Sequence, residues 1–506
     1  MALPHLVPLA VSALIGTLVF CVCRCIYNVF WHPLSGVPGP KIHAASQLPY
    51  IYHLTRGEWP RRIQRLHEIY GPAVRFGPND VSFLSADAWR QIYSLKTGGE
   101  ATFDKDRRIY PEPPSGNQSI LSASDENHRR MRRLLSHAFS EQALRGQEAV
   151  IQHYVGLLMD KLGEKARGGE AVDIVEWLNF TTFDLLGDLA FGEPFGCLEN
   201  SSYHPWVAMI FKAVAVLPFL ESLRRVPLLL PMAAFIVPRD LLRSVKDHAA
   251  LSEKTVRKRL DASNLDREDF MSYIQRHNHD GDGDGDGDSK GLTMNFAETV
   301  ENASVMIIAG SETTATLLSG VVYHLLTNRP VYDELVREVR TSFASEDDIT
   351  MLKVDGTKYL PAVLQEGLRM YPPVPTGLPR YVPEGGRFVE GHWLPEKTSV
   401  SISIWASAQS PLHWHEPETF APERWLGDER FAGDEKGMLN PFSHGARDCI
   451  GKNLAKAEMR LILARLLWNF DLEIVPESRG WTKQSIYYLW DKGPLMVKLT
   501  PVRKQG

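Results

Sequence analysis

Hydrophobic and polar residues follow several distinct patterns along this chain. An uncharged, mainly apolar run extends from Leu6 to Cys23, just long enough for a helix that spans a bilayer, which needs at least ~17 such residues. Short apolar runs at 73–76 and 81–84, separated by turn residues, predict two strands of a small sheet. Helical periodicity dominates from about 126 to 370, whereas the chain from 387 onward mixes β-branched runs with turn signals. The pattern predicts a mainly α protein with small β-sheets, in an α+β arrangement.

The first apolar run is interpreted as a membrane anchor. No lysine or arginine precedes Arg24, so the run lacks the basic start of a cleaved signal peptide. Arg24, Lys41 and Arg56 follow it and no acidic residue occurs before Glu58, so the positive-inside rule predicts a cytosolic body. Prolines between 32 and 40 then forbid a continuing helix. We predict a transmembrane anchor at 1–25, a proline-rich hinge at 26–45 and a single catalytic domain at 46–506.

Composition excludes some classes of function. The net charge of -5 gives no indication of a nucleic-acid partner. The five cysteines form no C-x-x-C pair, which argues against a disulfide framework and indicates a reducing compartment. The sequence leaves open whether Cys21, Cys23 and Cys25 are lipidated. The acidic, glycine-rich run Asp280–Asp288 lacks the glutamate that an EF-hand loop needs, so we interpret it as a solvated loop.

One cysteine near the end of the chain lies in a glycine-flanked loop. Cys449 follows Phe442 and Gly445 and is followed by Gly451, at the start of a predicted helix over 452–467. A helix start offers the positive end of the helix dipole and free backbone N–H groups, both of which favour a thiolate. A thiolate is one of the few protein ligands of haem iron. Cys449 is therefore a candidate iron ligand, although a buried structural cysteine is the alternative.

The complete pattern F-x-x-G-x-R-x-C-x-G, from Phe442 to Gly451, resembles that of the cytochrome P-450 superfamily. The resemblance implies that Cys449 is the axial ligand of haem b (iron protoporphyrin IX). The residues of the proline-rich segment 32–40 and of Ser136–Ser140 look most like those of fungal microsomal members of this superfamily, particularly hydroxylases of trichothecene type. The resemblance also implies that the chain adopts the cytochrome P-450 fold. It further implies a single-pass helix that anchors this domain in the endoplasmic reticulum membrane.

A polar acid–alcohol pair interrupts a long apolar helical pattern at Glu312 and Thr313. Val305, Ala309 and Thr313 recur at a spacing that places them on one helix face, and the threonine hydroxyl can bond back to the Ala309 carbonyl and loosen the helix. The pattern A-G-x-E-T-T, which includes Gly310, resembles the oxygen-binding groove of cytochromes P-450. By that resemblance Thr313 would steady iron-bound peroxide, and Glu312 with water would relay its protons.

Further motifs fit the same resemblance. Glu366 and Arg369 form an E-x-x-R pair on a helix, and P-E-R-W brings Arg424, which the family joins to that pair in a buried structural network. Basic residues suited to the haem propionates come in three places. These candidates are Arg447, Arg380, and the i, i+4 pair His128 and Arg132, where the family usually has a tryptophan in place of the histidine.

The resemblance implies a monooxygenase that inserts one atom of O₂ into a lipophilic small molecule, in a fungal secondary-metabolite pathway of terpenoid, polyketide or alkaloid type. The resemblance also implies that electrons come from NADPH through a separate flavoprotein reductase. The chain contains no G-x-G-x-x-G fingerprint, which supports an external electron source. The alternatives are a reductase-independent enzyme that rearranges hydroperoxides and a non-catalytic haem-thiolate sensor. The substrate, the oxidised carbon, the pathway and the oligomeric state are left open.

Two surfaces are expected by position. Arg129 and Arg133, helped by Lys452 and Lys456, would form the docking face for the reductase. Mostly apolar segments would wall the substrate pocket. They are Trp206–Leu242 with its prolines at 218, 227, 231 and 238, Val374–Leu378, Ile109–Pro114, and Tyr487–Leu489.

Overall fold

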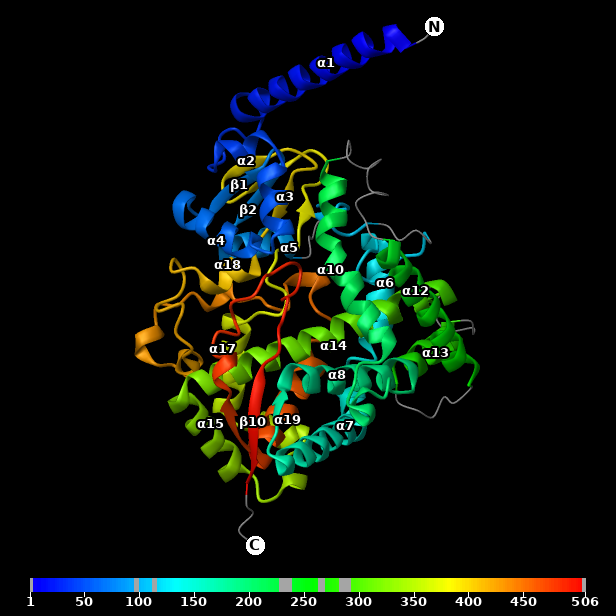
Figure 1. Cartoon of the computed structure of the whole chain (residues 1–506), viewed down its shortest axis with the longest axis vertical. Coiled ribbons are helices and arrows are strands. Elements are labelled where there is room, and N and C mark those ends of the chain that lie inside the picture. The colour runs from blue at the N-terminus through cyan, green and yellow to red at the C-terminus, as the bar shows by residue number, and fades with distance from the viewer. Residues whose placement is uncertain are drawn as a thin grey trace.

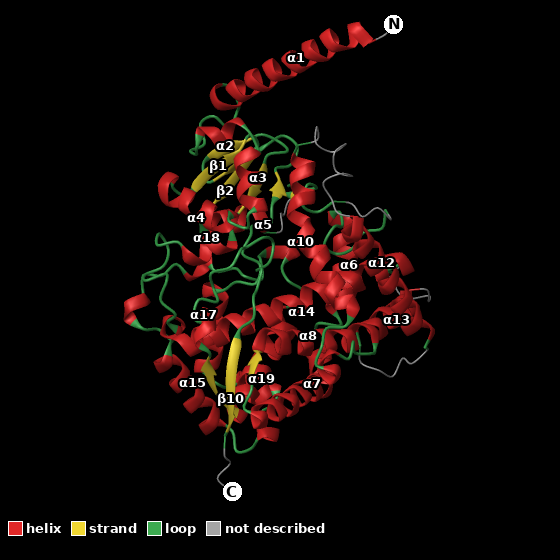
Figure 2. Cartoon of the chain, in the orientation of Figure 1, coloured by secondary structure: helices red, strands yellow, loops and turns green. Residues whose placement is uncertain are grey.

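Helices make up most of the chain, with strands gathered in a few small sheets (Figure 2). The computed structural model describes residues 3–94, 100–111, 116–226, 239–262, 269–281 and 293–502. Most of the predicted loop over 280–288, positions 112–114, and the prolines at 227, 231 and 238 lie outside these residues. The predicted mainly α architecture with small sheets is confirmed.

The N-terminal helix α1 (Leu3–Phe30) extends away from the rest of the protein (Figure 1). Three described helices are long and apolar enough to cross a membrane. In two of them 47% and 72% of the apolar window is buried in the fold, whereas in α1 only 6% is buried. The amide of Asn28 donates to the carbonyl of Ala45, and Arg75 donates to the carbonyl of Asn28. These bonds fix the end of α1 to the body, while its apolar length stays exposed.

A small five-stranded sheet lies next to α1, with helices α2 (Lys41–Ala45), α3 (Leu48–Thr55), α4 (Trp59–Tyr70) and α5 (Ala86–Tyr93). Its strand order is β1-β2-β8-β5-β3. The predicted strands at 73–76 and 81–84 are confirmed as its antiparallel pair β1 and β2, and the N–H-to-carbonyl ladder reaches into the turn at Gly77 and Asp80. The strands are β1 (Ala73–Gly77), β2 (Asp80–Phe83), β3 (Asp104–Lys105), β5 (Arg380–Tyr381) and β8 (Ser399–Ser401).

The larger part of the molecule is a helical body around α14 (Phe296–Thr327), which crosses its middle (Figure 1). A capping box between Asn295 and Glu298 begins this helix. Its apolar side chains join the largest buried cluster of the protein, and α8, α12, α17 and α19 pack against it. The helices of this body are α6 (Asp125–Ser136), α7 (Glu141–Gly168), α8 (Ile174–Phe191), α9 (Cys197–Asn200), α10 (Pro205–Arg225), α12 (Arg239–Asp261), α13 (Phe270–Gly281), α15 (Arg329–Ser342), α16 (Met351–Asp355), α17 (Tyr359–Met370), α18 (Ile404–Gln409) and α19 (Lys452–Asn469).

Two smaller sheets complete the fold. A three-stranded antiparallel sheet of order β4-β10-β9 closes the body near the C-terminus, and β6 and β7 form an isolated hairpin. These strands are β4 (Ala171–Asp173), β6 (Arg387–Val389), β7 (His392–Leu394), β9 (Phe470–Ile474) and β10 (Met496–Pro501). The segment between β9 and β10 runs back to α14, where Lys492 contacts Glu312.

Candidate active site

The cysteine loop leads directly into α19, as predicted. The backbone N–H of Cys449 donates to the carbonyl of Phe442 at 2.9 Å, and Gly451 is the N-cap residue of α19. Gly445 has φ +78°, and a Cβ there would overlap the carbonyl oxygen of Tyr93, so this turn requires glycine. The loop presents the Cys449 side chain, which is exposed, to a cavity beneath α14.

Opposing effects act on the thiol of this cysteine. Desolvation by the protein around the cavity raises the pKa of the Cys449 thiol, whereas the N–H of Gly451 and the charge of Arg132 lower it. The helix start thus favours the thiolate against a desolvation that favours the thiol. A metal cation at the sulfur would supply the missing stabilisation, since a coordinating thiol is deprotonated.

The face of α14 that the spacing predicted does line this cavity. Val305, Ala309 and Thr313 all border it, on the side of α14 that faces the cysteine loop. The Thr313 hydroxyl donates to the Ala309 carbonyl at 2.6 Å, as expected for a threonine in mid-helix. Gly310 also borders the cavity, and a Cβ there would lie 3.0 Å from the side chain of Leu186.

Glu312 points elsewhere. It borders a second cavity, enclosed by α8, α10, α14 and the C-terminal segment before β10, and not the one that contains Cys449. Its Oε1 atom lies 2.5 Å from Nζ of Lys492 and accepts a hydrogen bond from the Thr316 hydroxyl at 3.2 Å. The acid and the alcohol that adjoin in sequence thus face different cavities, because neighbouring residues on a helix point in different directions.

Basic side chains gather at the edge of the first cavity. His128, Arg132 and Arg447 border it, and Arg380 lies close enough to lower the pKa of His128. Burial and these charges lower the pKa of His128 to about 3, so the imidazole is neutral. Arg132 forms an ion pair with Asp448, and Arg447 forms one with Asp125.

Sequence reasoning missed one member of this group. Lys105 is 5% exposed, borders the cavity and donates to the carbonyl of Leu121. Its pKa is lowered well below the ordinary value by burial and by the neighbouring Arg380 and Arg447. Strand pairing sets Lys105 opposite Arg380, and no local pattern signals that register.

These residues fit the cofactor that the sequence implied. Nη1 of Arg380 and Nη1 of Arg447 are buried without a hydrogen-bond partner in the described structure, and buried guanidinium groups seek carboxylate partners. The cavity between them and Cys449 is lined mostly by apolar side chains. Haem is a flat, mainly apolar ring with two carboxylates and a central metal. These groups match the apolar walls, the free Nη1 atoms of the two arginines and the thiol, respectively.

The predicted structural network is present in the fold and is fully buried. Arg369 donates to both carboxylate oxygens of Glu366, at 3.0 and 2.8 Å, and Nε of Arg424 lies 3.5 Å from the same carboxylate. Each of these side chains is 0% exposed. Trp425 and Asp434, which the sequence did not single out, complete it by bonding to Glu366 and Arg424.

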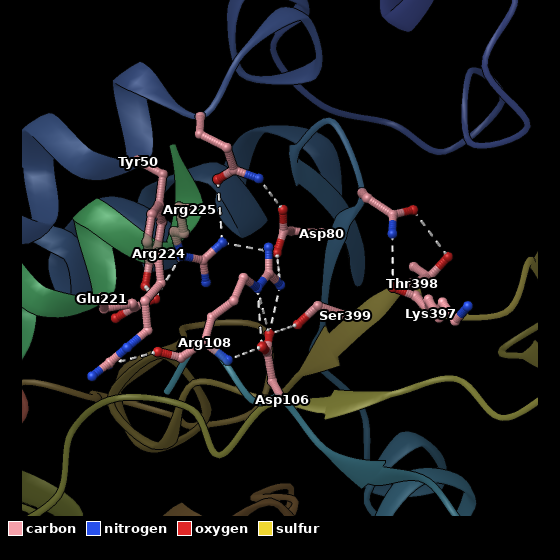
Figure 3. A network of polar contacts seen from close by, with 12 residues as sticks. Tyr50, Asp80, Asp106, Arg108, Glu221, Arg224, Arg225, Lys397, Thr398 and Ser399 are labelled. Carbon is pink, nitrogen blue, oxygen red and sulfur yellow. Dashed lines mark hydrogen bonds and ion pairs between the residues drawn. The ribbon is translucent and has the colours of Figure 1, made fainter. Parts of the chain in front are cut away.

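A second buried ionic network, unforeseen from the sequence, joins α10 to the N-terminal sheet (Figure 3). The carboxylate of Asp80 lies 2.7 Å from Arg108 and 3.0 Å from Arg225, and Arg225 also pairs with Glu221 at 2.6 Å. Burial alone would raise the pKa of Asp80, but the two arginines outweigh it and hold the pKa below its ordinary value. The network fixes the C-terminal end of α10 over strand β2.

The predicted substrate walls divide between the two cavities. Val374 and Leu378 border the cavity of Cys449, together with Ile120 and Met306. Several residues of α10, together with Tyr487 and Leu489, instead border the second cavity. The described part of the predicted wall at 109–114 borders neither of these two cavities. The roof expected over the cysteine therefore lies, in the described residues, over the neighbouring space.

Comparison with known proteins agrees with this geometry. The family model described as Cytochrome P-450 matches residues 42–499. Cytochrome P-450 monooxygenase astA of Talaromyces wortmannii is 44% identical over 94% of this chain and 94% of its own. Trichothecene C-15 hydroxylase of Fusarium sporotrichioides is 43% identical over 96% of both chains. Cytochrome P-450 monooxygenase lcsI of Purpureocillium lilacinum is 43% identical over 96% of this chain and 93% of its own.

The chain belongs to the cytochrome P-450 family. It is an oxidoreductase of the monooxygenase class, and the family implies a haem cofactor and a redox partner. The predicted family, fold class and class of enzyme are confirmed.

Proposed function

We propose that this protein inserts one atom of O₂ into a lipophilic small molecule in a fungal secondary-metabolite pathway. The observation that carries the proposal is that Cys449 and Thr313 border the same largely apolar cavity from opposite sides. An apolar pocket with few polar groups favours a lipophilic guest. The relative named trichothecene C-15 hydroxylase, a fungal enzyme that by its name oxidises a small molecule, supports the proposal.

The residues of the first cavity fit defined roles. Cys449 would hold the iron of haem b, with Phe442, Gly451, Ala309 and Gly310 beside the ring, and the haem would supply the reduction and cleavage of O₂. The propionates would meet Arg380 and Arg447, each of which has a buried Nη1 atom without a hydrogen-bond partner among the described residues. Lys105, Arg132 and the neutral imidazole of His128 would supply further hydrogen-bond donors at the same edge of the cavity. Thr313, whose hydroxyl donates to the Ala309 carbonyl, would hold a water molecule beside that turn of α14.

Substitution of the cysteine tests the proposal. Cys449→Ser should abolish the strongly red-shifted absorption band of the reduced carbon-monoxide complex and the NADPH-dependent activity. Cys197→Ala is a matched control, because Cys197 is also a cysteine without a disulfide but is buried away from the cavity. Survival of the band in Cys449→Ser would overturn the assignment.

The proposal also covers the source of the electrons and the membrane in which the enzyme resides. An NADPH-dependent flavoprotein reductase would deliver electrons, and α1 would anchor the enzyme in the endoplasmic reticulum membrane with its body in the cytosol. The exposed apolar helix supports an anchor. The division into anchor at 1–25, hinge at 26–45 and domain at 46–506 stays a prediction, although α1 continues to Phe30 and α2 begins at Lys41. Alkaline carbonate extraction that released the full-length protein would contradict a spanning helix.

A further inference from the structure

A buried lysine holds the acid of the acid–alcohol pair. The side chains of Glu312 and Lys492 are each 5% exposed, and Nζ of Lys492 lies 2.5 Å both from Oε1 of Glu312 and from the hydroxyl oxygen of Thr316. The three groups form a closed triangle, because the Thr316 hydroxyl also donates to Oε1. A buried carboxylate needs such a cation, since desolvation of an unpaired charge is costly.

The two oxygens of Glu312 have different environments. Oε1 carries both interactions of the triangle, whereas Oε2 is buried and has no hydrogen-bond partner among the described residues. A carboxylate oxygen in that state is the natural acceptor for a water molecule or a proton. Glu312 is therefore anchored at one oxygen and available at the other.

Lys492 is itself held in position by the segment before β10. Trp490 stacks on Tyr371 with ring centroids 4.0 Å apart, and its indole N–H donates to the Pro372 carbonyl at 2.7 Å. Tyr488 donates to the carboxylate of Glu221 in α10. These contacts fix the backbone on both sides of the second cavity, so the lysine is not a loose surface side chain.

The second cavity offers a route for protons to Glu312. It is bordered by the carboxylates of Asp173, Glu176 and Asp491 and by the hydroxyl group of Tyr203, besides Glu312 and Lys492. Burial raises the pKa of Asp173 and of Glu176 above the ordinary values of these acids. These polar groups thus share one cavity with Glu312.

We propose that Lys492 is a positioning residue for proton delivery to the oxygen site. It binds Oε1 of Glu312 and so leaves Oε2 as the atom that takes up a proton from the second cavity and passes it, by way of water, toward Thr313. The inference rests on the proposed function. Without the lysine, the carboxyl group would lose its orientation and its charge partner, and protons would reach bound oxygen more slowly.

The fate of O₂ in the absence of substrate measures this step. With reductase and NADPH, one O₂ either takes two electrons and two protons to leave as H₂O₂, or takes four electrons and four protons to leave as two waters. Only the second outcome breaks the O–O bond, and slow proton supply favours the first. The amounts of NADPH consumed and H₂O₂ formed therefore report on proton delivery without knowledge of the substrate.

In Lys492→Met the fraction of consumed O₂ that leaves as H₂O₂ should rise several-fold. The D₂O solvent isotope effect on water formation should also increase. The absorption band of the reduced carbon-monoxide complex should stay unchanged. Lys492→Arg should restore the wild-type partition. Adding Lys492→Met to Glu312→Gln should produce no further change, because both act through one carboxylate. Lys498→Met is the matched control, since this lysine is exposed on β10.

Three results would overturn the inference. They are a wild-type partition in Lys492→Met, no rescue by Lys492→Arg, or full additivity with Glu312→Gln. If Lys492→Met does not bind haem, the double variant replaces it in the test, because that variant removes both buried charges. It is compared with Glu312→Gln alone. A difference between the two in the partition of O₂ between H₂O₂ and water would contradict a shared route. Failure of the proposed function is distinguishable, because the wild-type protein would then lack the carbon-monoxide band or NADPH-dependent O₂ consumption.

Discussion

The guanidinium group of Arg132 lies 2.6 Å from the carboxylate of Asp448, the residue that precedes Cys449. Arg132 also donates to the backbone carbonyl of Asp448. Helix α6 is thereby bonded to the loop that presents the cysteine. Because His128 borders the cavity one turn earlier in α6, the same helix contacts both the loop and the proposed propionate site.

Loss of this bond should weaken haem retention more than it weakens the fold. The pair is partly exposed, so it contributes only ~1 kcal/mol or less to folding. Arg132→Ala should nevertheless lower the haem bound per protein, measured from the reduced carbon-monoxide band. Asp448→Asn should have a smaller effect, because the bond to the backbone carbonyl remains. Equal haem content in Arg132→Ala and wild type would contradict this role.

Thr313→Ala should lower the amount of product formed for each NADPH consumed. The hydroxyl that bonds to Ala309 borders the cavity, so its loss removes a group that can hold water near the oxygen site. Haem content should be unchanged, and more NADPH should end as H₂O₂. Thr327→Ala is the matched control, since that hydroxyl makes the same backward bond, to Tyr323, at the far end of α14. Unchanged coupling in Thr313→Ala would reject the assignment.

Removal of one charge from the buried E-x-x-R network should be strongly destabilising. Glu366→Gln leaves Arg369 and Arg424 buried without their shared anion, which we expect to cost about 3–5 kcal/mol in the free energy of unfolding. Glu334→Gln tests the same i, i+3 spacing in an exposed pair with Arg337, where we expect less than about 1 kcal/mol. Urea denaturation measures both. A similar loss in the two variants would show that burial does not set the effect.

Buried histidines should make the fold less stable in mild acid. Burial lowers the pKa of His67 to about 4, and its two ring nitrogens are bonded to Gly71 and Ser82. Below its ordinary pKa of about 6.5, the unfolded chain takes up a proton that the folded chain does not, so stability is complete above about 6.5 and falls as the pH drops toward 4.

At about pH 5 this loss reaches ~2 kcal/mol for one such histidine, at 1.36 kcal/mol for each pH unit. His67→Gln stays uncharged in both states, so its free energy of unfolding should change less between pH 7 and pH 5 than that of the wild type. Urea denaturation at the two pH values measures the difference. The same pH dependence in both proteins would exclude His67 as a source.

The docking face for the reductase can be tested by charge reversal. Arg129 and Arg133 are exposed on α6, on a different face from buried His128, and Lys452 and Lys456 lie at the start of α19. Reversal of both arginines to glutamate should slow reductase-driven turnover and flatten its dependence on salt, because steering by exposed charges weakens over a Debye length of ~10 Å.

Peroxide-driven turnover bypasses the reductase and should stay intact in this double variant. The reversal of Arg90 and Arg337, two arginines exposed on other helices, serves as a matched control. An equal loss of activity with peroxide and with reductase would mean that Arg129 and Arg133 act on the fold or the haem.

The residues that could be predicted from the sequence are those whose neighbours are close in sequence. The cysteine loop, the bond from Thr313 to Ala309 and the pairing of Glu366 with Arg369 follow from turn chemistry and helix spacing. The exposed apolar helix α1 follows from a continuous apolar run. Arg424 was found because the family resemblance joined it to that pair, and not from spacing.

Tertiary structure decided which charged groups meet. Lys492 and Glu312 are separated by 180 positions, and the partner of Glu312 depends on where the segment before β10 folds back. The position of Lys105 depends on the register of β3 with β5. Local sequence patterns set which faces are apolar and where helices begin, whereas pairing between distant charges is set by packing. The sequence therefore determined the cysteine loop and the central helix, and only the three-dimensional fold decided which cavity lies beside Glu312 and which beside Thr313.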